Sequence, residues 1–255
     1  MILALDVGNT NTVLGCMDDD KIHFTAHFAT DRTKTSDEYA ILVQSLFMVK
    51  RCTFSKIEGG IISSVVPELS EVLKEAIEKV TGKSSLIVGS GLKTGLNILI
   101  DNPAQLGSDL VVDAIAAYAE YPKPTLIFDM GTATTLSVLD AKGKYIGGMI
   151  MPGVRLATEA LSRETAQLPH ISLEAPKKIT GTNTVDCMKS GAIFGNAAML
   201  DGVIDRIEEE LGQPATVVAT GGFAHHIVPY CRRRITFDRD LTLKGLYIIY
   251  KKNIK

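Results

Sequence analysis

The chain has 255 residues, of which 45% are hydrophobic and 22% are charged, and its formal net charge is −2. This length suits one large domain or two modest ones, and the composition is that of an ordinary globular protein. The near-neutral charge excludes the electrostatic footprint of a nucleic-acid-binding protein, and no apolar run approaches the roughly 20 residues of a membrane span.

The first part of the chain opens with three strands and then alternates helices with strands. Residues 2–5 are apolar and end at the carboxylate of Asp6, and residues 22–29 alternate apolar with polar side chains, as in a half-buried strand. Ser36 can cap the helix that follows, whose first turn is acidic. We expect strands over residues 2–5, 13–17, 22–29, 59–66 and 84–88, and helices over residues 37–50 and 68–82. This order predicts an α/β fold with a mixed sheet.

The second part of the chain repeats this order of elements. A helix opens near Ser108, and Pro122 and Pro124 then interrupt the chain before a new strand begins at Thr125. This strand leads through an Asp-x-Gly turn into two more strands, as at the start of the chain. After them we expect a helix over residues 154–162, a long loop over residues 167–183, a helix over residues 184–211 and a strand over residues 216–219.

An internal repeat connects the two parts. Asp6 and Asp129 are separated by 123 residues, and so are Gly8 and Gly131. The same offset pairs two further positions, Thr12 with Thr135 and Val13 with Leu136. Such self-similarity predicts two related halves, each beginning with a hairpin that carries an acidic residue.

The hairpin at the start of the chain combines a carboxylate with a small, polar turn. A carboxylate at a strand end is costly to bury alone, and it is tolerated where it faces a cation, a cleft or backbone donors. Gly8 lets a ligand approach the backbone closely, and the four residues after it offer donors that can hold an anion such as phosphate. Asp6 can then hold Mg²⁺ through water. The alternative is a tight hairpin in which Asp6 caps its own turn.

A second candidate site lies at the start of the helix near Ser108. Asp109 is in the first turn of this helix, where the dipole favours an ionised carboxylate. An ionised Asp can accept the proton of a substrate hydroxyl, as phosphoryl transfer requires. Asp113 lies four residues on, on the same face of the helix. The alternative is that Asp109 serves only as a favourable partner of the helix dipole.

Six stretches of the chain resemble the type III pantothenate kinase family. They are LALDVGNTNTVLG at residues 3–15, NPAQLGSDL at 102–110, FDMGTATTLSVLD at 128–140, GGMIMPGVRLATEAL at 147–161, TAQLP at 165–169 and GTNTVDCMKSG at 181–191. The resemblance covers nearly the whole chain. It implies the α/β fold of acetate and sugar kinases, Hsp70 and actin, with two ribonuclease-H-like (actin-like ATPase) domains. Each domain would have a mixed five-stranded sheet flanked by helices, with ATP in the cleft between the domains. We expect the domains over residues 1–120 and 121–255.

The resemblance also implies an activity and its site residues. Members of this family phosphorylate pantothenate with ATP, the first step of coenzyme A biosynthesis, as homodimers that require a monovalent cation. By position, the phosphate loop would be Asp6, Val7, Gly8, Asn9, Thr10, Asn11, Thr12 and Val13, with Asp6 near Mg²⁺. Other positions match a phosphate contact of ATP (Thr132), the site of K⁺ or NH₄⁺ (Asp129) and the backbone beside adenosine (Gly221 and Gly222). The pantothenate motif would be Gly107, Ser108, Asp109 and Leu110, with Asp109 as catalytic base and Thr184 reaching the site from the partner subunit.

Two positions depart from the family pattern. The motif usually reads Gly-x-Asp-Arg, but Leu110 stands at the place of the Arg, and Ile100 stands where a Tyr usually precedes the Asn-Pro pair. The leading interpretation is an ATP-dependent kinase of pantothenate. The two departures leave open a kinase of another small hydroxyl compound. A non-catalytic, nucleotide-binding accessory protein is the other alternative, although it would have no evident reason to keep both acidic turns and the acidic helix start.

The remaining features concern the location of the protein. The four cysteines are widely spaced without a metal-type pattern, and they predict reduced thiols. Asp6 interrupts the apolar start before the core of a signal peptide could form. We therefore expect a cytoplasmic homodimer with a small-molecule substrate and with neither a nucleic-acid nor a membrane partner.

Overall fold

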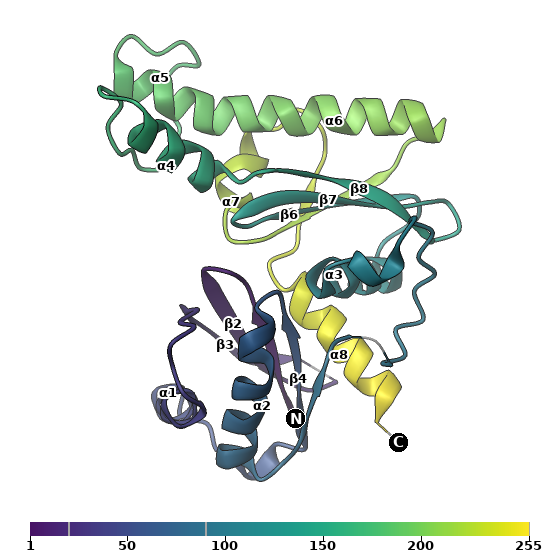
Figure 1. Ribbon diagram of the computed structural model, residues 1–255. Helices are drawn as coiled ribbons and strands as arrows, with labels where there is room; N and C mark the ends of the chain where they lie inside the picture. Colours follow the sequence, from purple (N-terminus) through teal and green to yellow (C-terminus); the bar gives the residue numbers. More distant parts are fainter. Residues whose placement is uncertain (20, 90, 255) are drawn as a thin grey trace. The chain divides into compact units, whose positions relative to one another are not determined.

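The computed structural model describes residues 1–19, 21–89 and 91–254, and the chain forms two compact units that interleave in sequence (Figure 1). The first unit contains Met1–Leu96, Asn102–Ala116 and Leu241–Lys255, and the second contains Asn97–Asp101 and Ala117–Asp240. The domain ranges expected from the sequence stay a prediction. The compact units differ from those ranges mainly because the end of the chain returns to the first unit.

The first unit is built on a mixed five-stranded sheet in the order β3-β2-β1-β4-β5. The central strand β1 pairs antiparallel with β2 and parallel with β4. Its unbroken apolar run reflects burial on both faces of the sheet, as is usual for a central strand. The five strands are β1 (Ile2–Val7), β2 (Asn11–Met17), β3 (Ile22–Ala29), β4 (Gly59–Ser64) and β5 (Ser85–Ile87).

Helices cover both faces of this first sheet. Leu5 packs with Val43 of α1 and Leu73 of α2 in one core cluster, whereas α8 lies against β1 and β4. Gly15 leaves room for α8, because a Cβ at this position would lie 2.8 Å from the Leu243 side chain. The helices are α1 (Ser36–Val49), η1 (Phe54–Lys56), α2 (Pro67–Thr81), η2 (Pro103–Gln105), α3 (Ser108–Glu120) and α8 (Leu241–Asn253).

The start of α1 differs by one residue from the expectation. The cap is Thr35, not Ser36: the Thr35 side chain accepts a hydrogen bond from the Glu38 backbone N–H, and the Glu38 carboxylate accepts one from the Thr35 N–H. This reciprocal pair is a capping box, which satisfies two N–H groups at once. The sequence Thr-Ser-Asp-Glu fits it because the glutamate stands three residues after the threonine.

The second unit repeats the same sheet. Its order is β10-β9-β6-β7-β8, so that β6, β7, β8 and β9 take the places of β1, β2, β3 and β4. β6 again pairs antiparallel with one neighbour and parallel with the other. The strands are β6 (Thr125–Met130), β7 (Ala133–Leu139), β8 (Tyr145–Pro152), β9 (Thr216–Thr220) and β10 (Thr236–Phe237). The expected α/β fold with two mixed five-stranded sheets is confirmed.

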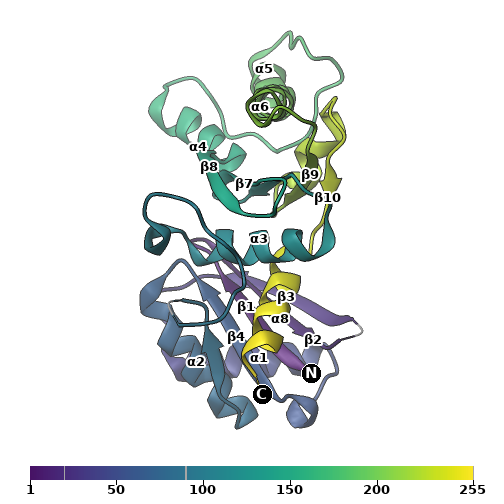
Figure 2. The ribbon, with the colours of Figure 1, turned by 90° about the vertical axis from the view of Figure 1, so that its right-hand side faces the viewer.

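Helices of the second unit follow the strands as the sequence indicates, with one interruption. The helix expected over residues 184–211 is divided by a π-helical turn, η3, and Figure 2 looks along its longer part, α6. Ala197, Leu200 and Ile204 of α6 pack on the sheet in the second core cluster. The helices are α4 (Val154–Glu164), α5 (Thr184–Ser190), η3 (Gly191–Gly195), α6 (Asn196–Leu211), α7 (Ala224–Ile227) and η4 (Val228–Tyr230). In the described part of the chain, the helices all lack the length or the apolar character needed to cross a membrane.

Candidate active site

The first acidic hairpin joins β1 to β2. Asp6 is the penultimate residue of β1 and lies between Val13 of β2 and Ser63 of β4 in the sheet. The Gly8 N–H donates to the Asn11 carbonyl over 3.0 Å, which puts the next two residues at an exposed tip. The structure therefore brings the whole predicted phosphate loop, residues 6–13, into one hairpin.

The helix start that carries Asp109 is attached to the same end of the first sheet. The Ser108 hydroxyl donates to the Ser64 carbonyl over 3.2 Å and accepts from the Ser63 hydroxyl over 3.0 Å. Ser63 is the strand neighbour of Asp6. Two serines at the end of β4 thus connect the Asp6 hairpin with the Asp109 turn inside one compact unit.

The carboxylate of Asp109 is folded back over the chain that precedes it. Its Oδ1 accepts a hydrogen bond of 2.9 Å from the Leu110 N–H, and a Cβ at Gly107 would overlap that same oxygen. Burial raises the pKa of Asp109 above its ordinary value, although hydrogen bonds from the backbone N–H groups of Leu110 and Asp109 act in the opposite direction. Burial therefore outweighs the effect expected from the helix start, and a raised pKa makes the carboxylate a stronger proton acceptor.

The second acidic hairpin joins β6 to β7. Asp129 is the penultimate residue of β6 and lies between Thr135 of β7 and Thr220 of β9. The Gly131 N–H donates to the Ala133 carbonyl over 2.9 Å, and Thr132 is exposed at the tip. The second hairpin therefore holds the same place in its sheet as the first hairpin holds in the first sheet.

The register of this hairpin corrects the offset expected from the sequence. Val7 lies opposite Thr12 in the first hairpin, whereas Met130 lies opposite Thr134 in the second. The second loop is therefore one residue shorter, and the offset falls from 123 on the first strand to 122 on the next. The structural counterparts are Thr12 with Thr134 and Val13 with Thr135.

Glycines allow three segments of the second unit to meet beside Asp129. Gly221 follows β9 with a φ of +90°, and a Cβ there would overlap Asp129 Oδ1 and the Met130 backbone. A Cβ at Gly153 would overlap the Thr132 carbonyl. Gly222 has no such neighbour. Only glycine suits the first two positions, because a side chain at either one would overlap the second acidic turn.

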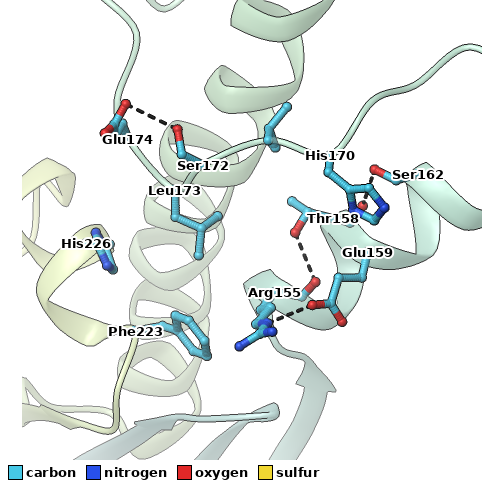
Figure 3. A pocket seen from close by; sticks show the side chains of 11 residues that line it. Arg155, Thr158, Glu159, Ser162, His170, Ser172, Leu173, Glu174, Phe223 and His226 are labelled. Atoms are coloured by element: carbon cyan, nitrogen blue, oxygen red, sulfur yellow. Dashed lines mark hydrogen bonds and ion pairs between the residues drawn. The ribbon is translucent and has the colours of Figure 1, made fainter.

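A cavity of about 470 Å³ opens in the second unit between the first turns of α4, residues 170–174 and the start of α7 (Figure 3). Phe223, directly after Gly222, and Leu173 point into it, and so does Arg155, which forms an ion pair with Glu159 over 2.7 Å. His226 is at its edge. An aromatic and an aliphatic wall with a few charged groups suit a flat heterocycle that carries polar substituents. No role was predicted for these residues: Arg155 and Glu159 lie within the 147–161 stretch, but they meet Leu173 and Phe223 only through the fold.

Thr184 is exposed at the first position of α5. The helix cap is Asn183, whose Oδ1 accepts from the Asp186 N–H over 2.9 Å. Thr184 belongs to the second unit, whereas Gly107–Leu110 belong to the first. Among the described residues no cluster of three His, Cys, Asp or Glu side chains is arranged to hold a metal ion.

Comparisons with known proteins identify the family of the chain. The model of the type III pantothenate kinase family matches residues 2–206. A protein of Exiguobacterium sp. named type III pantothenate kinase is 44% identical over 255 residues, with full coverage of both chains. One from Halalkalibacterium halodurans with the same name is 44% identical over 254 residues, again with full coverage of both.

A solved structure supports the fold. It is described as a conserved putative Baf family transcriptional activator from Campylobacter jejuni, and it has 20% identity and a TM-score of 0.60, with 98% of each chain covered. At this level of identity the likeness concerns the fold alone.

Proposed function

The chain belongs to the type III pantothenate kinase family, and we propose that it transfers the γ-phosphoryl group of ATP to the primary hydroxyl of pantothenate, with Asp109 as the general base. The observation that carries the catalytic assignment is the Asp109 carboxylate. It is half-buried at the start of α3, with a pKa raised by desolvation, and Ser63 and Ser64 attach that turn to the strand end of Asp6. The reaction is the first step of coenzyme A biosynthesis.

The chemical step is a proton transfer coupled to phosphoryl transfer. Asp109 takes the proton of the substrate hydroxyl while the hydroxyl oxygen forms its bond to the γ-phosphorus. The bond from that phosphorus to the oxygen that bridges the β- and γ-phosphates breaks, and ADP leaves. The raised pKa of Asp109 supports this role, because a base with a pKa nearer to neutrality accepts a proton more readily.

The phosphates of ATP are assigned to the two acidic turns. Within residues 6–13, Asn9, Thr10 and Asn11 are exposed and offer amides and a hydroxyl, and Thr132 holds the matching position in the second unit. Asp6 would hold Mg²⁺ through water, as suits an ion that dehydrates reluctantly and binds with the phosphates instead of in a protein cage. Mg²⁺ held there would supply positive charge to the phosphates.

The nucleoside part of ATP is assigned to the 470 Å³ cavity of the second unit. Phe223 and Leu173 offer apolar surface for a base, and the Arg155–Glu159 pair offers polar groups at the wall. Phe223 follows Gly222, so the cavity begins where the sequence predicts that the backbone passes beside adenosine. This continuity along the chain supports the assignment.

A monovalent cation, K⁺ or NH₄⁺, is assigned to Asp129. The Thr135 hydroxyl oxygen supports this assignment: it belongs to the strand neighbour of Asp129, and in the described part of the chain this buried atom has no hydrogen-bond partner. A carboxylate with a neighbouring hydroxyl oxygen is the kind of donor set that hard cations prefer. The cation would compensate the charge of Asp129 beside the phosphates of ATP.

Pantothenate is assigned to Gly107, Ser108, Asp109 and Leu110. Leu110 is half-buried and cannot offer the charge of the Arg that the family pattern has there. For this reason a kinase of another small hydroxyl compound stays the second candidate. A non-catalytic accessory role is a weaker candidate, because the buried carboxylate of Asp109 serves no evident purpose without proton transfer.

We assign a homodimer as the working form, with Thr184 contributed to the partner's site. The second unit exposes several large apolar side chains along β8, α4, the segment that leads into α5, and α5 itself. They are Ile146, Met149, Ile150, Leu156, Leu161, Ile179 and Val185. Ile150 alone is 79% exposed. Exposed large apolar side chains are typical of surfaces that associate.

The deciding experiment measures ADP formation by the purified protein with Mg²⁺, with and without K⁺ and with and without pantothenate, and identifies the product by mass. Formation of 4′-phosphopantothenate that depends on pantothenate supports the function. ATP binding without pantothenate-dependent turnover would instead favour another small hydroxyl compound as the substrate.

A further inference from the structure

Thr30, the first residue after β3, holds the first acidic hairpin by three hydrogen bonds. Its hydroxyl donates to the Gly8 carbonyl over 2.8 Å and shares a hydrogen bond of 2.9 Å with the Thr12 hydroxyl. Its backbone N–H donates to the Thr10 carbonyl over 2.9 Å. One residue outside the predicted phosphate loop thus bonds to three residues within it.

These bonds determine which way the loop amides point. In a trans peptide the C=O and the following N–H point in opposite directions. Because the Gly8 carbonyl is directed to Thr30, the Asn9 N–H points away from Thr30. The Thr10 carbonyl is also directed to Thr30, so the Asn11 N–H points away as well. Thr30 therefore turns two N–H groups of the loop to one side, as a nest for an anion requires.

Arg32 adds a fourth attachment from the same segment. Its Nη2 donates to Asn9 Oδ1 over 3.0 Å, and its Nη1 lies 3.4 Å from Glu68 Oε1. Arg32 lies two residues after Thr30, in the turn that the Lys34 N–H closes on the Asp31 carbonyl. The exposed tip of the loop is thereby tied to the segment that follows β3.

The second hairpin provides an internal comparison. Gly153 stands in the place of Thr30: each follows the third strand of its sheet, and the Gly153 N–H donates to the Thr132 carbonyl as the Thr30 N–H does to Thr10. Gly153 has no hydroxyl. Accordingly the hydroxyl oxygen of Thr134, the counterpart of Thr12, is buried without a hydrogen-bond partner among the described residues. The hydrogen bonds that the Thr30 hydroxyl makes in the first hairpin thus have no counterpart at Gly153 in the second.

We infer that Thr30 is a positioning residue for ATP: its hydroxyl orients the Asn9 N–H group of the 6–13 loop toward the phosphates, and its backbone N–H orients that of Asn11. The inference rests on the proposed function, since it takes that loop as the phosphate loop. Thr30 touches neither ATP nor the reacting atoms in this role. It acts through the peptide planes of the loop, which it sets before the nucleotide arrives and so reduces the cost of ordering them.

The test compares Thr30→Val, which keeps the shape of the side chain and removes the hydroxyl, with Thr30→Ser, which keeps the hydroxyl. Thr30→Val is expected to raise KM for ATP about tenfold, because two side-chain hydrogen bonds of modest net strength are lost. KM for pantothenate is expected to stay within about twofold, and Thr30→Ser to restore KM for ATP. The control is Thr25→Val in the same strand, which should leave both constants unchanged.

Amide hydrogen exchange of residues 8–12 tests the role of Thr30 separately from the assignment of the phosphate loop. If ATP fails to slow exchange there in the wild type, the assignment of the phosphate loop is wrong. If ATP slows it equally in wild type and Thr30→Val, and KM for ATP is unchanged, the loop assignment stands and the role of Thr30 is refuted. An equal rise of both KM values in Thr30→Val, without rescue by Thr30→Ser, also contradicts the inference, because it indicates a general structural defect.

Discussion

Asp109 and Gly107 depend on each other: the Asp109 carboxylate occupies the space that a side chain at Gly107 would need. Replacement of Gly107 by Ala is therefore expected to push the carboxylate away from its hydrogen bond with the Leu110 N–H. We expect kcat to fall about 10- to 100-fold, because misplacement of a catalytic group by roughly 1 Å is costly. ATP binding is expected to change little. Steady-state kinetics and nucleotide titration measure both.

A matched glycine variant controls for the Gly107 result. A Cβ at Gly202 in α6 meets only the flexible end of Arg206, at 3.0 Å. Gly202→Ala should leave kcat unchanged. Wild-type turnover in Gly107→Ala would show that the position of the Asp109 carboxylate does not limit the reaction.

Asp109→Asn is expected to lower kcat about 10²- to 10⁴-fold while making the protein more stable at neutral pH. The pKa of Asp109 is raised by burial, so the folded state holds this proton more tightly than the unfolded state. Its contribution to stability is full below the unfolded pKa and is lost as pH rises through the folded pKa. At neutral pH the buried carboxylate is a cost, which the amide removes.

The measurement is the free energy of unfolding in urea of the wild type and of Asp109→Asn, each at pH about 7 and about 4. The advantage of Asp109→Asn should shrink toward the lower pH. A variant less stable than the wild type at neutral pH would contradict the role of burial at this carboxyl. Unchanged turnover would remove Asp109 as the base.

The sequence predicted both hairpins because their chemistry is local. An apolar strand that ends in Asp-x-Gly, repeated after 123 residues, needs no knowledge of distant contacts. The strand register of the second hairpin was harder to predict, because adjacent threonines at 134 and 135 offer two alignments with Thr12. Only the pairing of Met130 with Thr134 decides between them. Loop length, which the repeat does not encode, determined this difference.

The end of the chain and the cavity were missed for another reason. No helix or strand was predicted after residue 222, although Leu243, Leu246 and Tyr250 have helical spacing in α8. That spacing could have indicated the helix. It could not have indicated that α8 packs on β1, at the other end of the chain. The cavity residues Arg155 and Phe223 likewise meet only through the fold.

Thr242→Val is expected to destabilise the first unit by about 1–3 kcal/mol, because it removes a hydrogen bond to a charged group. The Thr242 hydroxyl donates to the carboxylate of Asp113 over 2.7 Å, and Asp113 is 2% exposed. This bond joins α8 to α3 within the unit. Chemical unfolding measures the loss, and Thr242→Ser serves as the control that keeps the donor. Equal stability of the Val and Ser variants would show that the hydroxyl contributes nothing.

Ile150→Lys is expected to convert a dimer into a monomer. The side chain is 79% exposed on β8, and a charge there would have to lose water in an apolar interface. Light scattering gives the molar mass. Ile41→Lys is the control, because Ile41 is also exposed, at 64%, but lies on α1 of the first unit. A fully active wild-type monomer would exclude both the dimer and the contribution of Thr184 to a partner.

Mixed dimers test the Thr184 assignment directly. Asp109→Asn and Thr184→Val subunits are each expected to be nearly inactive alone. If Thr184 serves the partner's site, an equal mixture should recover about a quarter of wild-type activity, since half of the dimers are mixed and each has one intact site. Failure of the mixture to recover activity, with subunit exchange shown separately, would place Thr184 in the site of its own subunit or outside it.

Asp129→Asn is expected to abolish the response of kcat to K⁺. Asp129 lies beside the buried Thr135 hydroxyl oxygen, and the backbone of Gly221 packs directly against its carboxylate. An amide keeps the shape of this side chain but not its charge, so the fold is retained while the attraction for a cation is lost. The measurement is a K⁺ titration of turnover at constant ionic strength, with Asp140→Asn, a surface turn residue, as the control. A K⁺ titration of Asp129→Asn that matches the wild type would move the cation to another site, whereas a loss of both basal and K⁺-dependent turnover with intact ATP binding would support the assignment. In the latter case phosphoryl transfer needs the carboxylate of Asp129 together with the cation that it holds.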